Sequence, residues 1–265
     1  MKFFWISIRT LFICLSILLG SMFYSAHRIS LKTHRMNVKS VPENDAELTV
    51  FFISDVHRRR IPKKLLNKVQ SRAGSVDLVI IGGDVAERGV PSDRVKNNVL
   101  KLSSLGPVYY VWGNNDREIG ESAIRDIIAA VGGVVLDNKS VRIPEHPDWI
   151  ISGADDPSSG NTNLKEAVGF EQDYMYQLVA VHNPSLFNKI LQLSKPELLV
   201  GGHTHGGQIR FGPFGMQPRG EFKEQREYSQ LISNGFGTTL VPLRFGAPPE
   251  THLITIQYKK RSGES

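Results

Sequence analysis

The chain has 265 residues, of which 22% are charged and 40% hydrophobic, and it carries a formal net charge of +6. Such a composition is typical of a folded globular protein. The single cysteine, Cys14, excludes a disulfide framework and a zinc site built on cysteines. No basic run is interleaved with aromatic residues, as a groove for single-stranded nucleic acid would require. The charge therefore favours an anionic surface or substrate, and no nucleic-acid partner is indicated.

Residues 1–27 are predicted to form an N-terminal membrane anchor. Residues 10–26 carry no charge, and with Arg9 at the interface the segment is just long enough to span a bilayer. A cleaved signal peptide is the rival interpretation, because a basic start and an apolar centre fit both. A small-x-small cleavage site ending at Ala26 is poor, because Tyr24 occupies the position where the first small residue should stand. We favour the uncleaved anchor; a buried core helix is a third interpretation.

The side of the membrane on which the main domain lies stays open. Lys2 and Arg9 precede the apolar segment, whereas residues 28–46 carry more basic side chains, so the Lys/Arg balance favours a cytoplasmic domain. Short anchors with a basic start, however, often export the domain that comes after them. Residues 28–46 are polar and contain Pro42 and Asn44, and we predict a basic linker that could rest on anionic lipid head groups.

Residues 47–260 are predicted to form one domain in which strands alternate with helices. Three stripes of apolar residues have helical spacing: Val95–Leu105 behind Ser92, Ile124–Val131 behind Ser122, and Leu186–Leu193. This alternation predicts an α/β domain whose sheets are covered by helices. Seven apolar runs are predicted to be strands: Leu48–Ile53, Leu78–Ile81, Val108–Trp112, Trp149–Ser152, Leu178–Val181, Leu198–Val200 and His252–Gln257.

Polar side chains of the kinds that bind metals follow five of these strands. Ligand sites in α/β sheets lie at the carboxyl ends of the strands, so these groups could converge. Each motif alone is weak: Asp84 after two glycines could simply cap a helix, and His182 could be an ordinary hydrogen-bonded histidine. Five such strand ends in one chain are difficult to explain by chance. The residues are Asp55 and His57, then Asp84, then Asn114, Asn115 and Asp116, then His182, then His203 and His205.

The order D-x-H, G-D, G-N-x-D, lone His and G-H-x-H resembles that of the calcineurin-like metallophosphoesterase superfamily. The resemblance covers roughly residues 47–258. The segments GADDP (153–157), GGHTHGGQ (201–208) and ISNGFGTTLVPLRFGAPPETHLITI (232–256) are similar to those of the small bacterial, often membrane-associated branch that contains YkuE and YaeI. The resemblance implies a four-layer sandwich of two mixed β-sheets flanked by helices, here preceded by a transmembrane helix.

The resemblance also implies a site for two divalent metal ions. Oxygen donors mixed with imidazoles suit Mn, Fe or Zn better than Ca. Two such ions can share a hydroxide and clamp the phosphoryl oxygens, so the implied activity is metal-dependent phosphoesterase chemistry by attack of a bridging hydroxide. The implied ligands are Asp55, His57 and His205 for one ion, Asn114, His182 and His203 for the other, and Asp84 as the bridge.

The chain departs from the family at Asn115, because the usual G-N-H-D reads G-N-N-D. The missing histidine is generally assigned to protonating the leaving group, and a carboxamide has no titratable proton. Asp116, which orients that histidine in the family, has lost its partner. General acid catalysis is worth about 10²–10⁴-fold, so we expect a phosphodiester or pyrophosphate substrate in preference to a broad range of monoesters. The alternative is a metal-binding but catalytically silent, membrane-tethered scaffold protein; a protein phosphatase is disfavoured.

Arg117, beside the metal-binding loop, and Arg244, in the branch-specific tail, are candidate substrate-phosphate contacts. A structural salt bridge is the alternative for each. Membrane attachment and the resemblance together suggest a lipid-linked or cell-envelope phosphate ester as substrate, and we expect a monomer.

Overall fold

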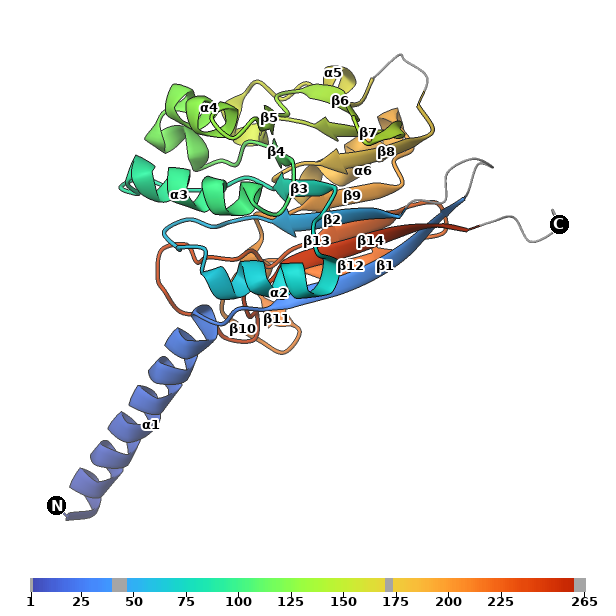
Figure 1. Ribbon diagram of the computed structural model, residues 1–265. Helices are drawn as coiled ribbons and strands as arrows, with labels where there is room; N and C mark the ends of the chain where they lie inside the picture. Colours follow the sequence, from blue (N-terminus) through green and yellow to red (C-terminus); the bar gives the residue numbers. More distant parts are fainter. Residues whose placement is uncertain (1, 40–46, 170–173, 260–265) are drawn as a thin grey trace.

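The computed structural model describes residues 2–39, 47–169 and 174–259, which form two packed sheets with helices on their outer faces and one helix projecting away (Figure 1). The first sheet has the order β1-β14-β2-β3-β4-β5, with β14 antiparallel to β2 and the other neighbours parallel. Its strands are β1 (Leu31–Lys39), β2 (Leu48–Ile53), β3 (Leu78–Ile81), β4 (Val108–Tyr110), β5 (Val134–Val135) and β14 (Thr251–Lys259).

The second sheet has the order β12-β13-β9-β8-β7-β6, and only its two outer pairs are antiparallel. A separate two-stranded hairpin pairs β10 with β11. The strands are β6 (Lys139–Ile143), β7 (His146–Gly153), β8 (Tyr176–Ala180), β9 (Leu198–Gly201), β10 (Arg210–Phe211), β11 (Phe214–Gly215), β12 (Glu221–Glu224) and β13 (Ser229–Ile232).

Helices cover the outer face of each sheet. Apolar residues of α2, α3 and α4 pack on the first sheet, and those of α5 and α6 pack on the second. The α-helices are α1 (Lys2–Ala26), α2 (Lys63–Ala73), α3 (Ser92–Ser103), α4 (Glu121–Ala129), α5 (Leu164–Val168) and α6 (Phe187–Leu193). Short 3₁₀ turns are η1 (Asp116–Ile119), η2 (Pro157–Ser159), η3 (Pro184–Leu186) and η4 (His205–Gly207).

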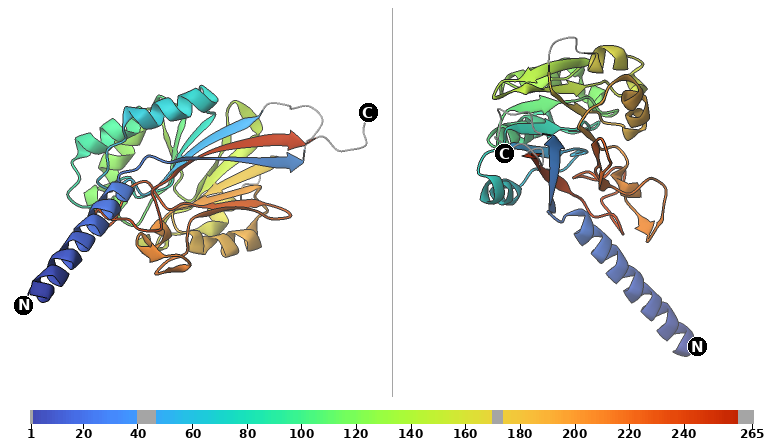
Figure 2. Two further views of the ribbon diagram at one scale, coloured as in Figure 1. Left: turned by 90° about the horizontal axis from the view of Figure 1, so that it is seen from below. Right: turned by 90° about the vertical axis from the view of Figure 1, so that its right-hand side faces the viewer.

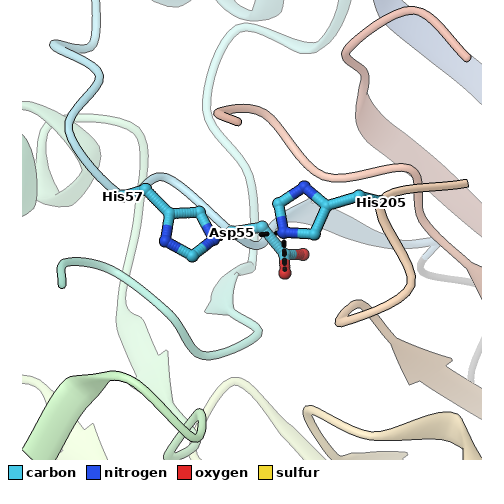
Figure 3. Close-up of side chains that lie close together, drawn as sticks. All are labelled: Asp55, His57 and His205. Carbon is cyan, nitrogen blue, oxygen red and sulfur yellow. Dashed lines mark hydrogen bonds and ion pairs between the residues drawn. The ribbon is translucent and has the colours of Figure 1, made fainter. Parts of the chain in front are cut away.

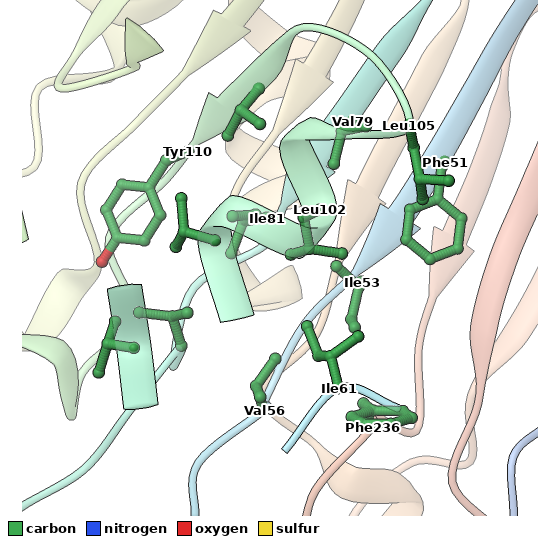
Figure 4. Packing of buried hydrophobic residues seen from close by; sticks show 14 of the residues in the cluster. Phe51, Ile53, Val56, Ile61, Val79, Ile81, Leu102, Leu105, Tyr110 and Phe236 are labelled. Carbon is green, nitrogen blue, oxygen red and sulfur yellow. The ribbon is translucent and has the colours of Figure 1, made fainter. Parts of the chain in front are cut away.

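The strands carry apolar residues on both faces because both faces are buried. In β2, Val50 and Phe52 belong to the cluster between the two sheets, whereas Phe51 and Ile53 belong to the cluster beneath the helices. Figure 4 shows the second of these clusters, in which Leu102 of α3 lies over the strands. Alternate residues of a strand thus face the other sheet and the covering helices, and the two sheets with their helices form four layers. The predicted sandwich of two mixed sheets flanked by helices is confirmed.

The prediction of a linker over residues 28–46 is wrong for Leu31–Lys39, which form the edge strand β1 parallel to β14. Met36 and Val38 are buried there. Their period-two spacing was hidden among charged residues, and the partner strand lies more than 200 residues away in the chain. Pro42 and Asn44 fall outside the described residues. The serines that precede two of the predicted helical stripes, Ser92 and Ser122, lie within α3 and α4, whose N-cap residues are Pro91 and Gly120.

Helix α1 projects from the domain, but its last turn packs against it (Figures 1 and 2). Met22 and Ala26 are buried. The backbone N–H of Arg244 donates to the Met22 carbonyl over 3.1 Å, and the Arg59 guanidinium donates to the His27 and Arg28 carbonyls at 2.7 Å each. The described part of the chain holds this one helix that is long and apolar enough to cross a membrane, and a signal sequence would pass the same test.

Candidate metal centre

The loops that follow β2, β3, β4, β8 and β9 meet at one end of the sandwich and bring the predicted ligands together. Five of these ligands have left-handed backbone conformations, with φ between 50° and 68°. They account for five of the eight non-glycine residues with positive φ in the described part of the chain. Such conformations are costly, and they concentrate at functional sites. The five are Asp55, His57, Asp84, His203 and His205.

Close approach of the chain at the site requires glycine at two positions. A Cβ at Gly113 would collide with the Asp84 carboxylate, and one at Gly202 would collide with that of Asp55. The glycines before the ligands therefore leave space for the carboxylates as well as allowing the turn.

The first cluster consists of Asp55, His57 and His205 (Figure 3). The Nε2 atoms of His57 and His205 lie 3.1 Å apart, and His205 Nε2 lies 3.3 Å from Asp55 Oδ1. All three side chains are buried. Two imidazole nitrogens and a carboxylate oxygen face one another here. A divalent cation can accept the lone pairs of all three atoms at once, which hydrogen bonds among the three groups cannot do.

The second cluster consists of Asn114, His182 and His203. The Asn114 Oδ1 atom lies 3.2 Å from His182 Nε2 and 3.0 Å from His203 Nδ1, and these two nitrogens are 3.2 Å apart. Again nitrogen and oxygen lone pairs converge on one point. The residues fit a second metal ion with two imidazole ligands and a neutral oxygen ligand.

Asp84 lies between the clusters. Its Oδ2 atom is 3.7 Å from His57 Nε2 and 3.4 Å from His182 Nε2, and its side chain is only 2% exposed. One carboxylate oxygen is thus within reach of a histidine from each cluster, which is the position that a bridging ligand requires. Both clusters fit the two divalent metal ions that the sequence implies.

Two further groups orient the imidazoles. His57 Nδ1 lies 2.9 Å from Glu87 Oε2, and His182 Nδ1 lies 2.9 Å from the Gly82 carbonyl oxygen, to which it can donate. Each contact leaves Nε2 directed into the site, as the hydrogen-bond partners of metal-binding histidines do. Sequence reasoning missed Glu87; the only signal was a carboxylate three residues after Asp84.

The site is electrostatically suited to cations. Although burial opposes its charge, the Asp84 carboxylate raises the pKa of His182 to about 10. Burial likewise works against ionisation of Asp84, but the positive charge of His182, with a smaller effect of His57, holds the pKa of this carboxyl well below its usual range. Burial lowers the pKa of His205 to about 4, and the charges of His57 and Arg244 act in the same direction. His205 therefore presents the neutral imidazole that metal binding needs.

Asn115 and Asp116, the predicted catalytic residues, both bind the Asp84 loop. The backbone N–H and the Nδ2 group of Asn115 donate to the two Asp84 carboxylate oxygens at 2.8 and 2.7 Å. Asp116 is fully buried and accepts the backbone N–H groups of Asp84 and Gly113, both at 2.8 Å. Burial and the nearby Asp84 charge raise the pKa of Asp116 to about 6. Asp116 therefore fastens two ligand loops together, and its burial does not fit contact with a substrate.

The two arginines predicted to bind substrate have protein partners. Arg117 forms a two-pronged pair with the buried Asp155, at 2.9 and 2.7 Å, so the structural alternative fits it better. Arg244 is fully buried and donates to the carbonyls of Gly237, Asn234, Ala247 and others, and its Nη2 lies 3.2 Å from His205 Nδ1. Arg244 cannot reach a substrate from this position, and the prediction is corrected: it supports the His205 loop.

Comparisons with known proteins agree with this geometry. The calcineurin-like phosphoesterase family model matches residues 48–207. The chain is 41% identical to the uncharacterized protein YpbG of Bacillus subtilis (strain 168), over 89% of this chain and 91% of that protein. It is 23% identical to the uncharacterized metallophosphoesterase YkuE of the same organism, covering 87% and 86%. It is 25% identical to phosphodiesterase YaeI of Escherichia coli (strain K12), covering 81% and 84%.

Proposed function

Because the chain belongs to the calcineurin-like phosphoesterase family and is a metal-dependent phosphoesterase, we propose that it hydrolyses phosphodiester or pyrophosphate bonds at the Asp84-centred site. The main support for this substrate class is the hydrogen bond that Asn115 Nδ2 donates to Asp84 Oδ2, at 2.7 Å, because it places the Asn115 side chain at the metal centre. A carboxamide stands where protonation of a poor leaving group would need a titratable group. The relative YaeI, named as a phosphodiesterase, supports this substrate class.

The seven residues of the two clusters and the bridge would hold two divalent ions of Mn, Fe or Zn. When bound, such ions supply Lewis-acid activation of water and neutralise phosphoryl charge. The chain's own part is to orient and to bind. Glu87 and the Gly82 carbonyl fix the ligand imidazoles, and Asn115 can offer an amide N–H to a phosphoryl oxygen.

A cavity of about 590 Å³ beside the site suits a phosphate ester. Asn115 lines it together with Arg58, Arg88 and Leu240. Glu87 and Glu118 line the cavity too and pair with Arg58 and Arg88, but the two arginine side chains are 66% and 84% exposed, whereas Arg117 is 27% exposed. Guanidinium groups recognise phosphate through paired N–H donors, so these two arginines replace Arg117 and Arg244 as the proposed substrate contacts.

We propose that α1 remains as an uncleaved anchor. The contacts of Met22, Ala26 and His27 with the domain support this, since cleavage after Ala26 would remove two buried side chains. An anchored site favours a lipid-linked or cell-envelope phosphate ester, hydrolysed by a monomer. The Lys/Arg balance on the two sides of α1 favours a cytoplasmic position for the domain.

The test is hydrolysis of a bis-aryl phosphodiester and of the aryl monoester by the full chain in detergent, stripped of metal and reloaded with Mn, Fe or Zn. The full chain is used because a truncated chain starting at residue 40 would lack β1. We expect diester turnover to exceed monoester turnover, and Asp84→Asn to lose metal and activity together. Two bound ions without turnover of any ester would instead support the silent scaffold.

A further inference from the structure

Exposed apolar side chains outside α1 gather in two segments. Nine large hydrophobic residues outside α1 are exposed in the described part of the chain, and six of them lie between residues 209 and 241. Single exposed apolar residues are ordinary, but a concentration of this kind marks an interaction surface. The six are Ile209 (36%), Phe211 (66%), Phe214 (78%), Met216 (93%), Leu240 (98%) and Val241 (45%).

Both segments lie beside the end of α1 that joins the domain. The β10–β11 hairpin projects next to this end in Figures 1 and 2. Leu240 and Val241 line a cavity of about 200 Å³ whose other wall includes Ala26 and His27. The apolar surface is therefore continuous with the helix that we propose to be the membrane anchor.

The two segments are held in place by contacts with the body of the protein. Gln208 Nε2 donates to the Thr239 and Val241 carbonyls at 2.9 and 3.0 Å, and the rings of Phe211 and Phe245 lie 5.0 Å apart. Leu240 has a φ of 61°, which is unfavourable for a branched side chain, and it is almost fully exposed. A fixed and strained loop that presents leucine outward is suited to placing it in an apolar medium.

We propose that residues 209–216 and 238–242 form a membrane-docking surface that inserts into the head-group region of the bilayer spanned by α1. The proposal rests on the proposed anchoring of α1. Aromatic, leucine and methionine side chains at a loop tip, rimmed by arginines, are typical of an interfacial contact. Arg58 and Arg88 line a cavity together with Leu240, Arg28 comes shortly after the end of α1, and all three are exposed and complement anionic lipid phosphates.

Docking in this orientation also restricts the substrate. Leu240 belongs to the docking surface and lines the same cavity as Asn115, Arg58 and Arg88. The cavity therefore opens at the level of the head groups. The substrate class that fits is a phosphodiester or pyrophosphate within a lipid head group, which reaches the site without leaving the membrane.

The test is the depth of single sites in the bilayer, measured on the full chain in vesicles of phosphatidylcholine and phosphatidylglycerol. Cys14→Ser removes the single native cysteine, and Phe214→Cys, Met216→Cys or Leu240→Cys then carries an environment-sensitive fluorophore. Leu100→Cys on α3 is the matched control, since Leu100 is 57% exposed and outside both segments. We expect blue-shifted emission that nitroxide-labelled lipids quench at the three sites and not at the control.

Emission from all three sites like that of the Leu100 control would overturn the proposal. So would a blue shift without quenching by nitroxide lipids, which would indicate a protein partner such as a second copy of the chain. The measurement requires no catalysis, so it can fail or succeed independently of the proposed hydrolase activity.

A second measurement links docking to turnover. In the variant with Phe214→Asp and Met216→Asp, we expect hydrolysis of a bilayer-embedded phosphodiester to fall roughly tenfold or more, because two large apolar side chains no longer insert. Hydrolysis of the soluble bis-aryl diester should be unchanged. Equal turnover of the embedded substrate by the variant and the parent chain would contradict the inferred role of the surface.

Discussion

Asn115 donates its side-chain N–H to Asp84 at 2.7 Å, while its backbone N–H donates to the other oxygen of the same carboxylate at 2.8 Å. The residue at the position of the family's general acid thus contacts, twice, the carboxylate that we propose as the bridge between the metal ions. An amide in this position can stabilise negative charge but cannot deliver a proton. This contact supports the proposed preference for substrates whose leaving group departs without protonation.

Replacing Asn115 by histidine should restore an acid. For Asn115→His we expect faster hydrolysis of esters with alkyl leaving groups, by up to about 10²–10⁴-fold, and little change for aryl esters. Rates measured over a series of leaving groups of increasing pKa check this, with Asn115→Ala as the control for loss of the Asp84 contact. A uniform change across the series would mean that position 115 does not face the leaving group.

Glu87 should matter for metal affinity although it is not a ligand. Its Oε2 atom lies 2.9 Å from His57 Nδ1, and this contact, ahead of the opposing effect of burial, lowers the pKa of Glu87. In Glu87→Gln we expect Mn affinity to fall about 10–100-fold, as for other carboxylates that bind a metal-ligating histidine. Calorimetric titration of metal measures this. Glu118→Gln is the matched control, because the Glu118 carboxylate contacts the guanidinium of Arg88 at 3.8 Å and accepts the Arg88 backbone N–H at 3.0 Å. Equal losses of metal affinity in both variants would contradict the role of Glu87.

Arg117 should stabilise the fold and leave substrate affinity almost unchanged. Its pair with the fully buried Asp155 is two-pronged, but Arg117 itself is 27% exposed. We expect Arg117→Met to lower the free energy of unfolding by about 1–3 kcal/mol, a discounted value for a partly buried pair. The double variant with Asp155→Asn should recover part of this loss. A raised KM with an unchanged melting temperature would support the original prediction of a phosphate contact.

The sequence predicted most of the sandwich because its central strands are continuous apolar runs. Leu48–Ile53 and Leu78–Ile81 form strands with the predicted bounds, since burial on both faces leaves no polar residue within them except Thr49. Strand β1 was missed because an edge strand with one solvated face contains charged residues. Local pattern does not reveal that its partner is β14.

The metal-ligand motifs were visible because each one follows a strand, and strand ends converge by topology. The partners of those ligands were not visible. Glu87, in the loop after β3, contacts His57 in the loop after β2, and Arg244 contacts His205, which lies 39 residues earlier in the chain. Its charge and its place in the branch-specific tail suggested that Arg244 binds phosphate, whereas its burial and its carbonyl partners show a structural role. Burial of a charged residue depends on tertiary packing, which residue type and spacing do not encode.

We expect the contact between β1 and β14 to make the stability of the fold depend on pH. His34 of β1 lies with Nε2 at 3.0 Å from His252 Nδ1 of β14, and His252 Nε2 lies 3.0 Å from Ser233 Oγ. One ring nitrogen of the pair must accept, so this arrangement does not allow both rings to be protonated at once. Burial, with a smaller effect of Lys32, lowers the pKa of His34 to about 4, and burial lowers that of His252 well below its ordinary value.

The unfolded chain therefore binds protons at these two histidines near pH 6.5, whereas the folded chain binds one at His34 only near pH 4 and one at His252 only well below pH 6.5. Stability is fully present above about pH 6.5 and is lost as the pH falls towards 4, by an amount on the order of 2 kcal/mol. We expect His34→Gln to weaken this dependence, because one of the two histidines is removed. Thermal unfolding of the metal-loaded full chain at pH 7.5 and pH 5 measures it, with the exposed His27→Gln as the control. If His34→Gln and His27→Gln lose equal stability between the two pH values, the contact between β1 and β14 is not the origin of the pH dependence.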